Sequence, residues 1–192
     1  MSTAKHDRQD AIQKATDLFW EKGFHATSMR NIQQAMDMRP GSIYASFGSK
    51  EGLFQESLQH YADSSKARLK ACVQEASSPL EGLKLFIRDA VVGCRDKAPS
   101  GICMLVKTIS ELTGENEDLL EQAKGLFKEM EQAFMEVLIE AQEQGEIDSS
   151  KAPYRLARTI QVQLMGLRVY GRANDGDEAI NELIDDIFDH LT

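Results

Sequence analysis

The stretch "MRPGSIYASFGSKEGLF", residues 38–54, decides how the N-terminal part of the chain folds. It predicts a tight turn, a short helix over about residues 40–46, and a longer helix capped by Ser49. Pro40 suits the first position of the short helix, because an N–H there would lack a partner within the helix. Ile43 and Phe47 are four residues apart and would face inward together. The other side chains of this helix would then be exposed.

Two further helices are predicted before this stretch. Apolar residues at helical spacing predict the first over about residues 7–22, and Gly23 is a typical residue to follow a helix end. The stretch "HATSMRNIQQAM" predicts a second helix with Thr27 or Ser28 as its N-cap. Asp37 is expected to end that helix, at a position that suits a left-handed backbone, which Asp tolerates better than most residues. Two helices joined by so short a turn indicate a helix-turn-helix, which places its second helix in the major groove of DNA.

The rest of the chain is also predicted to be helical, so the expected fold class is all-α. Apolar residues recur every three or four positions, and the sustained alternation typical of strands is absent. Ser78 and Glu81 form a capping box around Pro79, which marks a helix start. The expected helices run from about Ser49 to 75, from 79 to the break at "RDKAPSG", and over about 101–112, 117–144, 153–171 and 177–191.

Charge, hydropathy and cysteine content limit the classes of function. The 192 residues carry a net charge of −9, but the first 50 carry +2 and the remainder −11. The distribution of charge matters more for nucleic-acid binding than its sum. No apolar run is long enough for a transmembrane helix, and the N-terminus lacks the apolar segment of a secretory signal. Three cysteines without CxxC spacing favour reduced thiols in the cytoplasm.

No catalytic residue, cofactor or metal site is predicted. The sequence contains no phosphate-binding loop, no nucleophile elbow and no paired His–Cys or His–Ser with helical support. The four histidines share no spacing typical of metal ligands. These absences disfavour an enzyme.

The exposed residues around the short helix are interpreted as a DNA-contacting surface. Ser, Tyr and Arg side chains can hydrogen-bond to phosphates or base edges, and small residues let the backbone approach the duplex. Residues at neighbouring helix starts are added because helix N-termini favour anions. The predicted DNA-binding residues are Thr27, Ser28, Arg39, Pro40, Gly41, Ser42, Tyr44, Ser46 and Lys50.

Residues 8–58 resemble the DNA-binding domain of the tetracycline-repressor (TetR) family. The matching elements are "ATDLFWEKGFHATSMRNI" and "GSIYASFGSKEGLF". They contain an aromatic before Gly-Phe, a Thr-Ser at the second helix, a Gly-small-aliphatic-Tyr-x-x-Phe pattern and Ser-Lys-Glu-x-Leu. Asp37, Arg39, Pro40 and the pair Ala45-Ser46 depart from the residues usual in the family. These departures concern the operator sequence rather than the docking mode.

The resemblance implies a cytoplasmic, homodimeric transcriptional repressor that a small-molecule effector releases from a palindromic double-stranded DNA operator. It implies a helix-turn-helix domain over residues 1–50, a connecting helix over 51–75, and a ligand-binding and dimerisation domain over 76–192. The candidate ligand-binding residues are Phe86, Cys103, Met104, Phe127, Met130, Phe134 and Met165. The last two helices would build the dimer, with Gly166, Ile180, Leu183, Ile184 and Ile187 at its interface.

The sequence is also compatible with a second regulatory mechanism. Cys103 lies at the start of a helix, where the helix dipole, with Lys97 and Lys107 nearby, would stabilise a thiolate. The DNA-binding regulator could then sense oxidants or electrophiles through this cysteine, and Cys94 could lie across a short loop from it. The simpler interpretation of Cys103 is a small buried residue. A helical enzyme with a decayed helix-turn-helix, or an adaptor that does not bind DNA, is less favoured.

Overall fold

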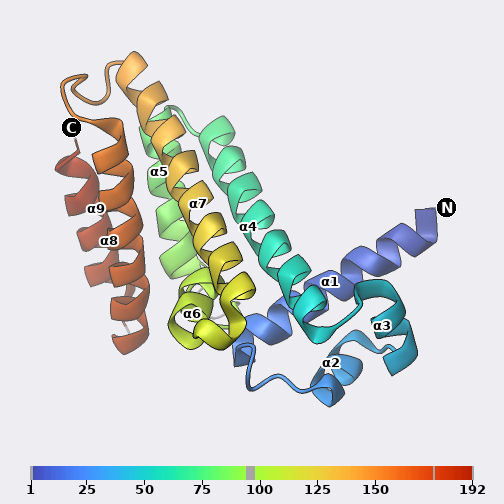
Figure 1. Cartoon of the computed structure of the whole chain (residues 1–192). Helices are drawn as coiled ribbons and strands as arrows, with labels where there is room; N and C mark the ends of the chain where they lie inside the picture. The colour runs from blue at the N-terminus through green and yellow to red at the C-terminus, as the bar shows by residue number, and fades with distance from the viewer. Residues whose placement is uncertain (1, 94–97, 175, 192) are drawn as a thin grey trace. The chain divides into compact units, whose positions relative to one another are not determined.

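The computed structural model describes residues 2–93, 98–174 and 176–191, and only the backbone of residues 2–7. These ranges are helical and contain no strand, as the sequence predicts (Figure 1). The helices are α1 (Ser2–Lys22), α2 (Met29–Met36), α3 (Pro40–Phe47), α4 (Lys50–Glu75), α5 (Pro79–Arg88), α6 (Met104–Glu111), α7 (Glu117–Glu143), α8 (Pro153–Ala173) and α9 (Asp177–Asp189), with the short helices η1 (Asp89–Gly93) and η2 (Gly114–Asn116).

The chain forms two compact units. The N-terminal unit contains the chain up to residue 63 and residues 103–127, and the C-terminal unit contains residues 64–102 and the chain from 128 onward. This division differs from the predicted one, which assigned everything after residue 75 to one C-terminal domain. The difference arises because Met104 and Leu105 of α6 are buried in the core of the N-terminal unit.

Local signals set the ends of the first helices. Gly23 follows α1 with a φ of +86°, and Asp37 follows α2 in the left-handed conformation with a φ of +52°. Ser28 is the N-cap of α2, and it forms a reciprocal capping box with Asn31. The end of α1, the N-cap of α2 and the end of α2 therefore lie where the sequence predicts them, while α1 begins at Ser2 rather than near residue 7.

Aromatic residues hold the core of the N-terminal unit together. The ring of Phe54 lies 4.8 Å from the ring of Phe19 and 5.0 Å from that of Phe24, measured between centroids. Ile43 and Phe47 of α3 are buried in the same core, as their spacing predicts. The core thus fixes which face of α3 points outward.

The C-terminal unit packs α5, α8 and α9 around a second apolar core. Lys84 and Arg88 of α5 each place a nitrogen 2.9 Å from a carboxylate oxygen of Asp185 on α9. The hydrogen bond from Lys84 lowers the pKa of Asp185 below its usual range. At the start of α5, Ser78 accepts the N–H of Glu81 as predicted, while Glu146 supplies a carboxylate to the Ser78 hydroxyl.

Candidate nucleic-acid interface

The outward face of α3 carries the predicted DNA-binding residues. Arg39 is the N-cap of α3, Pro40 is its first residue, and both are exposed. Tyr44 is 50% exposed, so it is not a core aromatic. Gly41, Ser42, Ala45 and Ser46 are also exposed. This surface combines hydroxyl groups, one guanidinium and very small side chains.

Gly41 opens this surface to close approach. A Cβ added at this residue would meet no atom of the described chain within 4 Å. Packing within the described residues therefore does not require a glycine here. The missing side chain leaves the backbone accessible to a partner, such as a DNA strand.

Thr27 and Ser28 differ in their accessibility. Ser28 is exposed at the start of α2, where it can face a phosphate. Thr27 is 0% exposed, and its hydroxyl donates a 2.6 Å hydrogen bond to the carbonyl oxygen of Gly23. This placement corrects the expectation that the Thr27 side chain contacts DNA, because its hydroxyl stabilises the turn between α1 and α2 instead.

Lys50 is the first residue of α4 and is half-buried. Its Nζ lies 4.2 Å from the centroid of the Phe24 ring, within the range of a cation–π contact. Burial lowers the pKa of Lys50, while the carboxylates of Glu51 and Glu111 oppose that shift. The ammonium is thus held at a helix N-terminus beside the helix-turn-helix.

Arg8 braces α3 from α1, a role that the sequence did not indicate. Its guanidinium carbon lies 4.9 Å from the centroid of the Phe47 ring, at the end of α3. Its Nη2 donates a 2.8 Å hydrogen bond to Glu56 of α4. Neither contact follows from local spacing, because Glu56 is 48 residues away in the sequence.

The predicted ligand-binding residues do not gather in one core. Met104 is buried in the N-terminal core, and Cys103 and Phe127 pack against it. Phe86 and Phe134 are buried in the C-terminal core, and Met130 packs against that core. The seventh residue, Met165 of α8, is half-buried.

Cys103 is the N-cap residue of α6 and is half-buried against the N-terminal core. The ammonium of Lys107 donates hydrogen bonds to backbone carbonyl oxygens of α1. Lys97 and Cys94 lie outside the described residues. The thiol of Cys72 is half-buried, and burial raises its pKa. Cys103 therefore packs against the N-terminal core without being fully buried in it.

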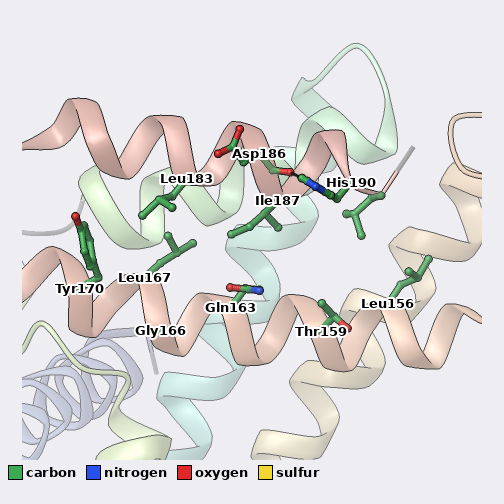
Figure 2. Close-up of a pocket in the computed structure, with 11 residues that line it drawn as sticks. Leu156, Thr159, Gln163, Gly166, Leu167, Tyr170, Leu183, Asp186, Ile187 and His190 are labelled. Carbon is green, nitrogen blue, oxygen red and sulfur yellow. Dashed lines mark hydrogen bonds between the residues drawn. The ribbon is translucent and has the colours of Figure 1, made fainter.

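A groove of about 690 Å³ runs between α8 and α9 (Figure 2). Leu183 and Ile187 of α9 project into it, with Gly166 and Leu167 on α8. Leu183 is 38% exposed, and a Cβ added at Gly166 would meet no described atom within 4 Å. The other lining residues are Leu156, Thr159, Gln163, Tyr170, Asp186, His190 and Leu191.

Two of the predicted dimer residues have side chains in the core of their own protomer instead of in the groove. Ile180 and Ile184 are 0% exposed and belong to the core of the C-terminal unit. Their side chains pack within the protomer, which corrects the expectation that they contact a second subunit. Of the four predicted interface residues on α9, Leu183 is exposed and Ile187 is half-buried, and both line the groove.

The described residues contain no group of three or more His, Cys, Asp or Glu that could hold a metal ion. In the same ranges, no helix is long and apolar enough to cross a membrane.

The sequence matches two family descriptions along most of its length. Residues 11–57 match the bacterial regulatory proteins of the tetR family, and residues 79–187 match the tetracyclin repressor-like C-terminal domain. The transcriptional repressor ComR of Escherichia coli K12 is 26% identical over 179 residues, or 92% of this chain and 85% of ComR. The transcriptional repressor DhaR of Mycobacterium sp. GP1 is 23% identical over 185 residues, which cover 96% of this chain and 91% of DhaR.

Solved structures share the fold over nearly the whole chain. A cysteine mutant of the TetR-family regulator CifR, in complex with 26-bp double-stranded operator DNA, has a TM-score of 0.85 and 28% identity, covering 96% of this chain and 97% of CifR. The reduced form of Escherichia coli NemR has a TM-score of 0.78 at 14% identity, with 95% of both chains covered. The chain therefore belongs to the TetR family of bacterial regulatory proteins and is a ligand-responsive DNA-binding transcriptional regulator, not an enzyme.

Proposed function

We propose that this regulator is a cytoplasmic homodimeric repressor that binds a palindromic operator through α3 of each subunit. The observation that carries the proposal is the outward face of α3, where Ser42, Tyr44 and Ser46 are exposed and the backbone at Gly41 is open. Such a face fits the major groove, where hydroxyl groups and arginine can reach phosphates and base edges. The operator-bound structure of CifR supports this docking mode.

Each exposed residue has a proposed role. Arg39, Ser42, Tyr44 and Ser46 contact the DNA by their side chains, while Pro40 and Gly41 let the start of α3 approach the backbone. Ser28 contacts a phosphate at the start of α2, and Lys50 does so at the start of α4. Base reading falls to α3, because it is the second helix of the helix-turn-helix.

The Tyr44→Ala variant is expected to weaken operator binding by roughly 1–3 kcal/mol, because it removes an exposed contact of α3. Fluorescence anisotropy with a labelled operator measures the effect. Tyr154→Ala is the matched control, since Tyr154 is equally exposed, at 53%, but lies on α8. Equal affinities of the Tyr44 variant and the wild type would remove this face of α3 from the interface.

The Lys50→Ala variant is expected to weaken binding to every DNA sequence to a similar degree. If Lys50 neutralises one phosphate, the slope of log K against log salt concentration should flatten by about one unit. Titrations at several salt concentrations measure that slope, with Lys124→Ala as a control of equal charge change on α7. A lower affinity with an unchanged slope would assign Lys50 a structural contact with Phe24 instead of a phosphate contact.

Repression ends, in this proposal, when a small-molecule effector binds and favours a conformation that does not fit the operator. The effector must bind that conformation more tightly, since equal affinity for both would shift nothing. The match of residues 79–187 to a tetracyclin repressor-like C-terminal domain supports an effector site there. The alternative, redox or electrophile sensing through Cys103, is not favoured. A screen of apolar ligands by thermal shift, followed by operator release, tests the assignment.

The dimer is proposed to form across the groove between α8 and α9. Leu183, Ile187 and Gly166 line that groove, and exposed apolar residues on α8 extend the surface. These further residues are Val162 and Val169. Two helices from each subunit would then form a four-helix bundle about a two-fold axis.

A further inference from the structure

Two charged residues of α6 reach the junction between α1 and α2. The Nζ of Lys107 donates hydrogen bonds of 3.1 and 2.7 Å to the carbonyl oxygens of Trp20 and Glu21, at the end of α1. The carboxylate of Glu111 accepts the backbone N–H groups of Phe24 and His25, at 3.0 and 2.7 Å. Residues four apart lie on one face of a helix, so both side chains serve the same junction.

The two charges match the backbone groups that they meet. The last carbonyl groups of a helix lack partners and carry a partial negative charge, which suits the Lys107 ammonium. The N–H groups of the following turn are donors, which suits the Glu111 carboxylate, and bonds to a charged group are stronger than neutral ones. All four backbone groups belong to residues 86 or 87 positions away from their partners in the sequence.

The turn is built around this carboxylate. Gly23 has a φ of +86°, and a Cβ added there would overlap the carboxylate of Glu111. The carbonyl oxygen of Gly23 accepts the buried hydroxyl of Thr27, and Ser28 follows as the N-cap of α2. A series of contacts therefore runs from Glu111 through the turn to the first residue of the helix-turn-helix.

The same turn also supports Lys50. Phe24, whose N–H is bound by Glu111, carries the ring over which the Lys50 ammonium lies at 4.2 Å. That ring also packs against Phe54 of α4, with 5.0 Å between centroids. A shift of the Phe24 backbone would therefore move the support of the Lys50 ammonium.

We propose that Lys107 and Glu111 are positioning residues for DNA binding, because they fix the α1–α2 junction that sets the start of α2 and the support of Lys50. Neither residue needs to touch DNA for this role. The inference rests on the proposed DNA contacts of α3 and Lys50. It assigns a function in DNA binding to a helix that sequence comparison places within the C-terminal family match.

The decisive variant is Glu111→Gln, because charge and positioning predict opposite results. Removing a negative charge from a DNA-binding protein should by electrostatics alone strengthen its binding to a polyanion. Positioning predicts operator binding about tenfold weaker, since one of two strong hydrogen bonds to the turn is lost. The salt dependence should keep its slope, because no phosphate contact is removed. The exposed Glu115→Gln is the matched control and should bind no more weakly than the wild type.

A second measurement reports on the junction itself. Hydrogen exchange at the N–H groups of Phe24 and His25 should be faster in Glu111→Gln than in the wild type, while far-ultraviolet circular dichroism shows equal helix content. Lys107→Met should also weaken operator binding without changing the salt slope. Should Glu111→Gln fail to fold, Glu111→Asp keeps the charge with a shorter reach and should still bind less tightly than the wild type.

Binding by Glu111→Gln that equals or exceeds that of the wild type would overturn the inference, as would unchanged exchange at Phe24 and His25. The Tyr44→Ala and Lys50→Ala titrations show whether the positioning role alone is wrong or the proposed DNA contacts are wrong as well. If those variants weaken binding and Glu111→Gln does not, the proposed DNA contacts stand and the positioning role falls. If none of the three weakens binding, the proposed interface itself is wrong.

Discussion

Leu183→Asp is expected to convert the homodimer into folded monomers. Leu183 projects into the groove between α8 and α9, and a carboxylate there would be buried without a partner in the proposed interface. Because each monomer carries only one recognition helix, affinity for the full palindrome should fall roughly a hundredfold or more, as linked sites gain about 10²–10⁴ in avidity. Sedimentation velocity measures the oligomeric state, and anisotropy with the full operator measures the affinity.

Leu85→Asp provides the control for this prediction. Leu85 is exposed to nearly the same degree, 36% against 38%, but lies on α5 outside the groove. The Leu85→Asp variant should remain dimeric and bind the operator as tightly as the wild type does. Gly166→Gln offers a second test, because the protomer leaves open space at that position while a partner helix would not. A Leu183→Asp protein that is folded and fully dimeric would refute the interface.

Ile184→Asp, one residue further along α9, should instead unfold the C-terminal unit. Ile184 is 0% exposed in the core formed with Leu83, Phe134 and Leu138. The variant loses apolar burial and buries a charge, which together should cost about 4 kcal/mol or more of the free energy of unfolding. Urea denaturation followed by circular dichroism measures the loss. Ile184→Val, which removes one methylene group, should cost only about 1 kcal/mol.

The pH dependence of the Ile184→Asp variant identifies the cause. Burial raises the pKa of a carboxyl group, so the introduced carboxyl group would stay neutral up to a higher pH in the folded form than in the unfolded form. A group with a raised native pKa destabilises the fold as pH rises above its unfolded pKa. The loss in free energy of unfolding, relative to the wild type, should therefore become smaller as pH falls toward about 4. If the loss in free energy of unfolding does not change with pH, its cause is the lost apolar packing and not the buried charge.

Local signals in the sequence predict the helix-turn-helix and its outward face. Gly23, Ser28, Asp37 and Pro40 act through their own backbone conformation or through neighbours within a few residues. Such signals are local, and they therefore mark helix ends without knowledge of the fold. The spacing of Ile43 and Phe47 then assigned the buried side of α3, and the DNA-contacting candidates followed as its complement.

The sequence did not distinguish which apolar residues of α9 belong to the core and which are available to a second subunit. One broad apolar stripe of α9 contains Ile180, Leu183, Ile184 and Ile187. Such a stripe predicts that its residues are buried, but it does not identify the element that they pack against. The tertiary structure divides this stripe, because Ile180 and Ile184 are buried in the core of their own unit while Leu183 is exposed in the groove. Ile187 lies at the boundary, since it packs against that core and also lines the groove. Hydrophobic burial is non-directional, so only the packed neighbours decide between core and subunit interface.

The support of the DNA-binding helices by other parts of the chain follows only from contacts between residues that are distant in the sequence. Thr27 resembles a surface cap in sequence, yet its hydroxyl is buried on the carbonyl oxygen of Gly23. Lys107 and Glu111 form an ordinary pair of surface charges four residues apart on α6, and nothing near them in the sequence indicates a partner. Their partners are backbone groups of α1 and the following turn, which any sequence possesses, so no residue pattern marks them.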